Sequence, residues 1–302
     1  DRMSRLIHAG SAVVDYVYRI DTLPQPAGEK TASAYDRVAG GGFNMMVAAR
    51  RTGMKVVFAG RHGTGPDGDF LRTAFAAEGI EILLPPTEGL DSGNSVVLIT
   101  EDAERTFVSW PGAEGVMSAD DLAKVTISDG DWIFTSGYTL SYPGNRDALS
   151  LWIAALPESI PLAFDPAPVV ADIPEAVLAR VLARTTWLSC NVTEAEVIAG
   201  GGNIQTNAEL LMDKCLQAAG VVIRAGEAGA YLRLRDGEAA MVPVFHVDAV
   251  DTNGAGDTHI GAFLSALARG SSAREAARYA NAAAAISVTR RGGSSAPVHS
   301  EI

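Results

Sequence analysis

VDTNGAGDTHIGAFLSAL, residues 250–267, is the most informative stretch of this chain. An apolar run ends at Val250, small residues occupy 254–256, and after Asp257 apolar residues recur at the spacing of one helix face. The first N–H groups of a helix have no partner inside it, and with the helix dipole they attract an anion. We therefore predict a phosphate site at this junction, with Asp257 kept ionised by the dipole and placed to accept a proton from a hydroxyl. Asp and Gly are also common where ordinary helices begin, so this stretch alone leaves a purely structural interpretation open.

The rest of the chain alternates between short apolar runs and helical patterns. This alternation is typical of a mostly parallel sheet with helices on both faces, and short apolar strands are expected where both faces are covered. We predict one doubly wound α/β domain over residues 1–302. Its expected strands are 6–9, 56–59, 132–135, 162–164, 187–190, 221–224, 230–235 and 239–244, and its expected helices are 44–51, 70–78, 146–156, 174–184, 208–219, 255–268 and 273–289.

Two regions depart from this alternation. Residues 13–20 and 31–38 look like extended segments around a proline-rich break, and 95–100 with 106–110 look like a hairpin. We expect these segments, drawn from about 12–38 and 95–110, to form a small β-sheet lid beside the main domain.

Composition restricts the class of partner. The chain of 302 residues has a formal net charge of -12 and a pI of about 4.8, so a nucleic acid or an anionic membrane is an unexpected partner. Its two cysteines, Cys190 and Cys215, have no metal-ligand spacing and are expected to be buried free thiols. Asp1 to Arg5 lead straight into an apolar strand pattern without a secretory signal, and we expect a cytoplasmic protein.

A second stretch makes the sequence recognisable. Gly40-Gly41-Gly42-Phe43-Asn44 precedes a helix, with Gly53 and Gly60 beyond it, and it stands about 200 residues before the first stretch. Together the two stretches resemble the paired signatures of the ribokinase-like, or PfkB, carbohydrate kinases, and the resemblance covers nearly the whole chain. It implies a doubly wound sheet with a β-lid, and ATP-dependent phosphorylation of a hydroxyl group on a small sugar.

The resemblance also implies roles for individual residues. Asp257 matches the catalytic base, and Gly254, Ala255 and Gly256 match the anion hole. The substrate-binding positions that match are Asp15, Gly41, Gly42 and Asn44.

Other matching positions concern the nucleotide and metal ions. Asn191 and Glu194 match an element that organises Mg²⁺, through water, near the phosphates. Asp251 and Asn253 match positions whose backbone carbonyls bind a monovalent cation, K⁺ being the candidate, with the Arg291–Gly293 turn closing the site. The positions that match the nucleotide site are Asn191, Glu194, Arg224, Gly226, Gly229 and Asn281.

Three positions differ from the family pattern. Arg224 stands where many members carry Thr, and either a phosphate contact or an ordinary strand end fits it. His259 replaces an apolar aromatic residue, and we expect a core or edge histidine because it lies off the helix face of Asp257. Residues 165–168 read DPAP and lack an Asn and an Arg that bind acidic sugars in some members.

Several alternatives stay open or are disfavoured. Gly63 to Gly68 fits G-x-G-x-x-G, but its turn-forming Pro66 and Asp67 favour a plain turn over a dinucleotide site. A nucleoside kinase of the same family is the nearest alternative function, with Phe43, Tyr138 or Trp110 as possible contacts to a base. A catalytically silent sugar-binding protein is another. An exposed lid face could also pair two subunits as a homodimer.

Overall fold

The computed structural model describes residues 3–302, so Asp1 and Arg2 of the predicted domain lie outside it. Its main feature is a nine-stranded sheet with the strand order β13-β12-β11-β10-β9-β8-β1-β4-β5. The seven strands from β11 to β5 are parallel, and β12 and β13 continue the sheet in antiparallel fashion. The strands are β1 (Arg5–His8), β4 (Lys55–Phe58), β5 (Glu81–Ile82), β8 (Asp131–Ser136), β9 (Leu162–Asp165), β10 (Trp187–Asn191), β11 (Gly220–Arg224), β12 (Ala230–Leu234) and β13 (Ala239–Val242).

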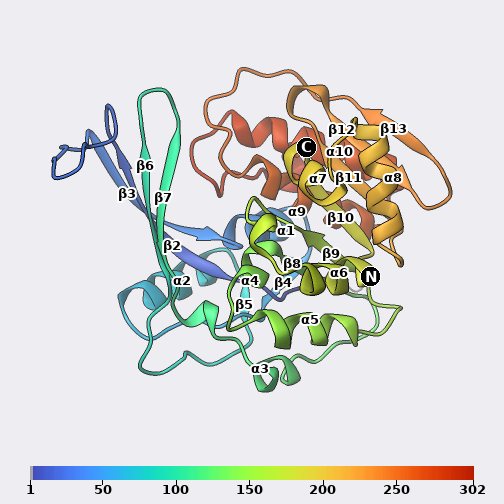
Figure 1. Ribbon diagram of the computed structural model, residues 1–302, viewed down its shortest axis with the longest axis horizontal. Coiled ribbons are helices and arrows are strands. Elements are labelled where there is room, and N and C mark those ends of the chain that lie inside the picture. Colours follow the sequence, from blue (N-terminus) through green and yellow to red (C-terminus); the bar gives the residue numbers. More distant parts are fainter. Residues whose placement is uncertain (1–2) are drawn as a thin grey trace.

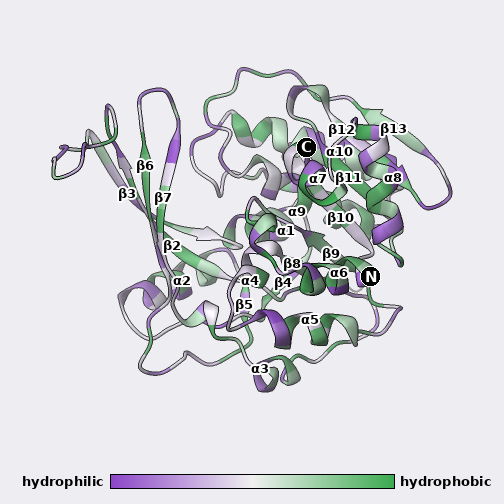
Figure 2. Ribbon diagram, in the orientation of Figure 1, coloured by the Kyte–Doolittle hydropathy of each residue, from purple (hydrophilic) through white to green (hydrophobic). Residues whose placement is uncertain are grey.

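Helices cover both faces of this sheet (Figure 1). Side chains alternate along each strand, so Leu6 of β1 joins one apolar core and Ile7 joins the other. Figure 2 shows the resulting apolar strands in the interior. The first core contains residues of α1 (Phe43–Arg51), α2 (Pro66–Ala77), α9 (Ala255–Ala268) and α10 (Ala273–Val288). The second contains residues of α3 (Ala119–Ala123), α4 (Gly137–Ser141), α5 (Arg146–Ala154), α6 (Glu175–Arg184), α7 (Val192–Ala199) and α8 (Ile204–Lys214).

A separate four-stranded sheet, which we call the small sheet, projects from this body on the left of Figure 1. It consists of β2 (Ala12–Arg19), β3 (Ala34–Gly41), β6 (Asn94–Ile99) and β7 (Arg105–Trp110), in the order β3-β2-β6-β7. β2 pairs antiparallel with β3 and parallel with β6, and β6 pairs antiparallel with β7. The doubly wound fold class and the small additional sheet are thus confirmed.

Two predicted helices have different bounds. α2 begins at Pro66 rather than at residue 70, because a proline that signals a turn is also favoured in the first turn of a helix. α8 spans Ile204–Lys214 rather than 208–219, and the Asn203 side chain accepts a hydrogen bond from the N–H of Thr206 at its start. Leu216, which extended the apolar pattern, is 71% exposed and lies beyond the helix.

The topology places the ends of the central strands at one edge. From β1, the chain first adds β4 on one side of β1. It later adds β8 on the other side of β1, and the sheet then continues in that direction through β9 and β10. In such a sheet, ligands bind outside the carboxyl ends of the strands near the point where the order reverses. Within residues 3–302, no helix is long and apolar enough to cross a membrane.

Candidate active site

Asp257 lies in the first turn of α9, directly after the glycine junction. Gly254 precedes the helix with φ at +77°, and a Cβ there would collide with the carbonyl oxygen of Gly293. The Ala255 N–H donates a hydrogen bond of 3.3 Å to the Thr252 carbonyl oxygen, Gly256 provides the next backbone N–H group, and no described side chain caps this turn. The junction therefore has the features of an anion site, with one carboxylate in the same helical turn.

Arg224, at the end of β11, connects this turn to the carboxyl ends of neighbouring strands. Its Nη1 donates a hydrogen bond of 2.9 Å to the carbonyl oxygen of Gly256. Its Nη2 lies 3.6 Å from Glu194 Oε1 and 3.8 Å from Asp165 Oδ2. Arg224 is therefore no ordinary exposed strand end, because it contacts the junction and two acidic side chains at once.

The surroundings of Asp257 favour its protonated form. Burial raises the pKa of Asp257 to about 7, and the charge of Asp165 acts in the same direction. Arg224 and a hydrogen bond from the Asn44 side chain oppose this shift. Desolvation is the largest of these effects, so the surroundings work against the ionised form that the helix dipole is expected to favour.

Asn191 and Glu194 form a reciprocal cap at the start of α7. Asn191 Oδ1 accepts a hydrogen bond of 2.8 Å from the N–H of Glu194, and Glu194 Oε1 accepts one of 3.0 Å from the N–H of Asn191. Burial and the neighbouring Asp165 raise the pKa of Glu194. This cap holds the Glu194 carboxylate beside Arg224, at the carboxyl edge of the sheet.

A cavity of about 450 Å³ opens between the α9 junction, the β12–β13 side of the sheet and α10. Five predicted nucleotide-site positions line it, namely Asn191, Arg224, Gly226, Gly229 and Asn281, and so do Ala255 and Gly256 of the predicted anion hole. Apolar residues from the segment after β13, among them Val244, Phe245 and Val247, form another part of the wall. Its size and apolar lining are typical of a site for an aromatic ligand.

Asn281 and His259 are tied together in the wall of this cavity. The Nδ2 of Asn281 donates to the carbonyl oxygens of Val242 at 3.0 Å and Pro243 at 2.9 Å, so both amide hydrogens are used. Its Oδ1 lies 2.8 Å from His259 Nε2, which must therefore carry the ring proton. Burial lowers the pKa of His259 to about 4, so the ring is neutral at pH 7. His259 is buried, as expected, but it also lines the cavity.

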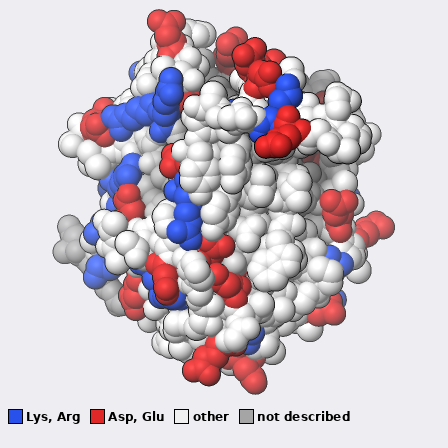
Figure 3. All heavy atoms as spheres, turned by 90° about the vertical axis from the view of Figure 1, so that its left-hand side faces the viewer, with Lys and Arg blue, Asp and Glu red and all other residues white. Residues whose placement is uncertain are grey.

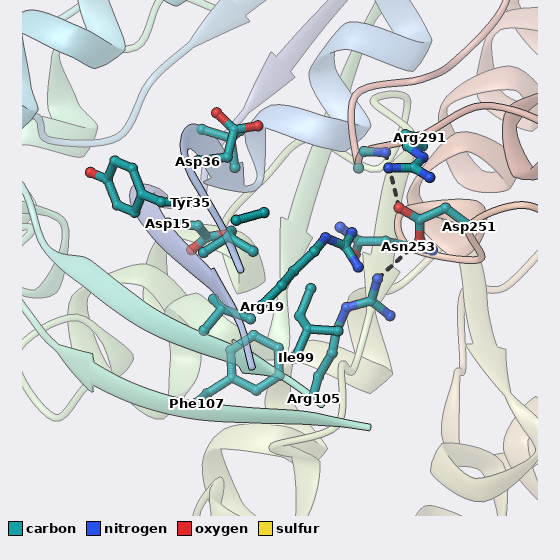
Figure 4. Close-up of a pocket in the computed structure, with 16 residues that line it drawn as sticks. Asp15, Arg19, Tyr35, Asp36, Ile99, Arg105, Phe107, Asp251, Asn253 and Arg291 are labelled. Carbon is teal, nitrogen blue, oxygen red and sulfur yellow. Dashed lines mark hydrogen bonds and ion pairs between the residues drawn. The ribbon is translucent and has the colours of Figure 1, made fainter. Parts of the chain in front are cut away.

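A second cavity, of about 320 Å³, lies between the small sheet and the loops around Asp251 and Gly292 (Figure 4). We call it the sheet cavity. Asp15 lines it, and burial raises the pKa of this carboxyl group to about 6. Asn253 and Gly293 line the same cavity from the body side. Asp257 is not among the described residues that line either cavity. It lies in the turn whose Gly256 lines the 450 Å³ cavity and whose Asn253 lines the sheet cavity.

Gly41, Gly42 and Asn44 are not among the described residues that line the sheet cavity. Gly42 packs closely below it, since a Cβ there would lie 2.5 Å from the carbonyl oxygen of Ser11. Asn44 hydrogen-bonds Asp257 and accepts a hydrogen bond of 2.9 Å from Ser294 Oγ. The structure therefore brings Asn44 to the predicted base, while the two glycines allow close backbone packing.

The Asp251 carboxylate holds the loop beside the junction. Its Oδ1 accepts hydrogen bonds of 2.9 Å from Asn253 N and from Arg105 Nη2, and its Oδ2 accepts one of 3.0 Å from Gly292 N. The 291–293 turn is therefore fixed against the loop whose backbone carbonyls are the predicted cation ligands.

The described residues contain no group of three or more His, Cys, Asp or Glu side chains arranged to hold a metal ion. Glu194 and Asp165 nevertheless provide hard oxygen donors; burial raises the pKa of both, and the charge of Asp165 further raises that of Glu194. Mg²⁺ typically keeps several waters and binds through one or two carboxylates and substrate phosphates. These residues fit a water-mediated Mg²⁺ site rather than a protein cage.

Sequence reasoning missed some residues of these cavities. It also missed Asp165, which lines neither cavity but lies 3.8 Å from Arg224, and which could have been found because it ends a buried strand at the same edge of the sheet as Asn191. Arg19, Arg105 and Arg291 line the sheet cavity, and no motif identified the first two. They meet only because the small sheet folds against the body.

Comparison with known proteins agrees with this architecture. Residues 3–300 match the model of the pfkB family carbohydrate kinases. An uncharacterized sugar kinase of Escherichia coli strain K12, YegV, is 33% identical over 97% of this chain and 91% of its own length. The ribokinase of Haemophilus influenzae is 30% identical over 97% of this chain and 95% of its own length.

Among solved structures, the aminoimidazole riboside kinase of Salmonella enterica, in complex with aminoimidazole riboside and an ATP analog, superposes with a TM-score of 0.80. It is 25% identical, and the match covers 98% of this chain and 97% of that one. The chain belongs to the PfkB family of carbohydrate kinases.

Proposed function

We propose that the chain transfers the terminal phosphoryl group of ATP to a hydroxyl group of a small sugar, with Asp257 as the base. An ATP-dependent kinase of a small sugar or nucleoside follows from the family membership, and the residue roles are the proposal. The observation that carries it is the junction itself: a helix N-terminus and a carboxylate with raised pKa, with one cavity on either side.

The proposed step is an in-line displacement. The acceptor oxygen forms a bond to the terminal phosphorus, the bond from that phosphorus to the bridging oxygen breaks, and ADP leaves. Asp257 takes the hydroxyl proton as the new bond forms. The backbone N–H groups at Gly254, Ala255 and Gly256 stabilise the charge on the transferred group, and this costs little reorganisation because the helix already holds them.

Positioning of the two substrates follows from the cavities. The base and ribose of ATP occupy the 450 Å³ cavity, where Gly226, Gly229 and Asn281 form wall and floor. Arg224 balances the negative charge of Glu194 and Asp165 where the phosphates approach. Asp15 accepts hydrogen bonds from acceptor hydroxyls in the sheet cavity, and the small sheet acts as a lid that excludes water.

Two ions fit this arrangement. Mg²⁺, held through water near Glu194 and Asn191, would neutralise phosphate charge. A monovalent cation such as K⁺ would bind backbone carbonyls of Asp251 and Asn253, beside the turn that Gly292 ties to Asp251. Chelation of Mg²⁺ is expected to abolish turnover, and replacement of K⁺ by a bulky organic cation is expected to reduce it.

A nucleoside acceptor is the second candidate, since the aligned Salmonella kinase binds a riboside. Phe43, Tyr138 and Trp110, the aromatic residues considered for a base, are not among the described residues that line the sheet cavity, but Tyr35 and Phe107 are, so aromatic contacts to a base exist there. The polar part of the lining, which includes Asp15, Asp36 and three arginines, suits a sugar. A silent sugar-binding protein is disfavoured because Asp257 and the junction glycines are in place.

We also propose a cytoplasmic homodimer. The face of the molecule that carries the small sheet has a broad uncharged area (Figure 3). Val108 and Trp110 of β7 are 67% and 51% exposed. A second copy of the chain would cover such apolar surface. Light scattering of the purified protein tests this, and a mass equal to one chain would contradict it.

The kinase proposal is tested by coupling ADP release to an optical readout with a panel of pentoses, hexoses, their acid and phosphate derivatives, and nucleosides. We expect acceptor-dependent ADP release with one sugar class. ADP release that no acceptor increases would count against phosphoryl transfer to a small molecule.

A further inference from the structure

Three arginines gather at one end of the sheet cavity. Arg19 of β2, Ile99 of β6 and Arg105 of β7 are neighbours in register, so both arginines stand on one rung of the small sheet, on either side of Ile99. Arg291 reaches the same place from the body. Figure 4 shows Arg19, Arg105 and Arg291 directed toward the loop that carries Asp251 and Asn253.

This end of the cavity carries excess positive charge. The three arginines and a single carboxylate, that of Asp251, line the adjoining space of about 270 Å³. Asp251 pairs with Arg105 at 2.9 Å. Arg19 and Arg291 form no ion pair with any other residue in the range 3–302. Such a cluster is unexpected by chance on a chain whose net charge is -12.

The two ends of the cavity wall differ in chemistry. Asp15 and Arg19 lie on the same face of β2, four residues apart, and at about 3.3 Å per residue their Cα atoms are about 13 Å apart. Val17 and Val97 lie between them on the same wall. The wall therefore offers a hydrogen-bond acceptor at one end, a middle in which Asp36 of β3 lies opposite Val17, and guanidinium groups at the other end.

We propose that the acceptor of this kinase carries an anionic group, a phosphate or a carboxylate, which Arg19, Arg105 and Arg291 bind. This inference rests on the proposed function and names its substrate class. Guanidinium groups bind both anions through paired hydrogen bonds. Asp251 holds Arg105 in place, so part of the site is ordered before the ligand arrives.

The arginines line the acceptor side of the site. None of the three is among the described residues that line the 450 Å³ cavity, and all three line the sheet cavity, although the adjoining 270 Å³ space shares Ala249 and Thr252 with the 450 Å³ cavity. The anionic group therefore belongs to the acceptor, at the end of the cavity away from Asp15.

The test uses matched probes that share a carbon skeleton: glucose, gluconate and glucose 6-phosphate, and ribose, ribonate and ribose 5-phosphate. Calorimetric binding and kcat/KM are measured for the natural chain, for the double variant Arg19→Gln/Arg291→Gln, and for the control Arg290→Gln. Arg290 pairs with Glu301 at 2.7 Å and does not line the sheet cavity.

We expect the anionic member of at least one set to exceed its neutral counterpart in affinity and in kcat/KM by tenfold or more. The double variant is expected to lose about tenfold or more for that anion, with the KM for ATP and the Arg290→Gln control unchanged. The carboxylate and phosphate members show which anion is the ligand.

Neutral sugars preferred over both anions would overturn the inference, and so would a double variant in which only the KM for ATP rises. Failure of the proposed function has a different signature. Arginine-dependent binding of every anionic probe without ADP release would leave the three arginines as an anion site and count against the proposed transfer step to these acceptors.

Discussion

Asp257 shows how a single carboxyl group is tuned by residues distant in sequence. Desolvation and Asp165 raise its pKa, while Arg224 and Asn44 lower it. The balance puts the pKa at about 7, so the group is ionised in only part of the molecules near neutral pH. A base with a pKa near the working pH is well matched to proton transfer.

The pH dependence of activity follows from this value. kcat/KM for the acceptor is expected to rise with pH through a midpoint near pH 7 and to level off above about pH 8, since only the ionised Asp257 accepts a proton. ATP itself titrates near pH 6, so a variant is needed to assign the group. Arg224→Gln is expected to move this rising limb of the pH–activity profile to higher pH, because the Arg224 charge lowers the pKa of Asp257. A limb near pH 4, or one that Arg224→Gln leaves in place, would argue against Asp257 as the base.

Gly254 provides a second test at the level of one residue. Alanine there must adopt φ near +77° and its Cβ would meet the Gly293 carbonyl oxygen. We expect Gly254→Ala to reduce kcat by about 100-fold or more, because the anion hole must shift. Gly270→Ala is the matched control: φ there is +93°, but nothing lies within 4 Å of the added Cβ. Equal effects of the two substitutions on kcat would mean that backbone strain alone is responsible.

The sequence predicted the position of Asp257 but not its ionisation. Spacing within residues 250–267 was sufficient for the helix start, the small residues and the carboxylate, because these are local features. The pKa depends on Asp165 and Glu194, which reach the junction through other strands, and a local pattern contains no information about them.

At the scale of elements, the contact of α1 with α9 sets the distance between Asn44 and Asp257. Gly261 of α9 faces α1, and a Cβ there would lie 2.6 Å from Ala48 Cβ and 2.9 Å from the Met45 carbonyl oxygen. The two helices can approach this closely because both have small residues at the crossing. The small residues of the two sequence signatures thus have a packing role in addition to their proximity to the site.

Gly261→Ala is expected to destabilise the protein by about 1–3 kcal/mol through overpacking. Helix propensity alone would change stability in the opposite direction by about 1 kcal/mol, since alanine is the better helix former. Urea unfolding measures whether the substitution lowers or raises the free energy of unfolding. A stabilised variant would show that the helices can separate without cost.

Element boundaries were less predictable than element types. The described strands other than β5 followed from apolar runs and alternation. The short elements β5, α3 and α4 were not predicted, and α2 and α8 begin four residues earlier than expected. In both cases a residue that often marks a turn, Pro66 or Asn203, lies at the start of the helix instead. Whether such a residue ends a turn or begins a helix depends on where the first turn of the following helix packs.

At the scale of the whole molecule, the active-site acids oppose folding at neutral pH. The pKa of Asp257 rises from 3.8 to about 7 in the folded chain, so the folded state binds its proton more tightly. The contribution of protonated Asp257 to the free energy of unfolding is complete below about pH 4 and is lost as the pH rises through 7. Burial raises the pKa values of Asp15, Asp165 and Glu194 as well, so they act in the same direction.

Asp257→Asn is therefore expected to stabilise the protein without ligands at pH 8, by on the order of 2 kcal/mol, and to have little effect at pH 4. Thermal unfolding at the two pH values measures this difference. A variant less stable than the natural chain at pH 8 would contradict the account of a costly buried carboxylate.

The small sheet shows the limit of sequence reasoning at this scale. Its strands were predicted, yet the meeting of Arg19, Arg105 and Arg291 depends on strand register and on how the sheet sits against the body. Paired signatures identified the family because they are short and local. The surface that we propose to select the acceptor is assembled from distant segments, and no single stretch of sequence encodes it.

The central claim, that Asp257 is the base for phosphoryl transfer, is tested most directly by single-turnover kinetics of Asp257→Asn with ATP binding measured in parallel. The account predicts that transfer to the acceptor slows by about 1000-fold or more while the affinity for ATP changes little, because the amide keeps the shape of the side chain but cannot take the proton. Transfer within a few-fold of the natural rate would contradict it.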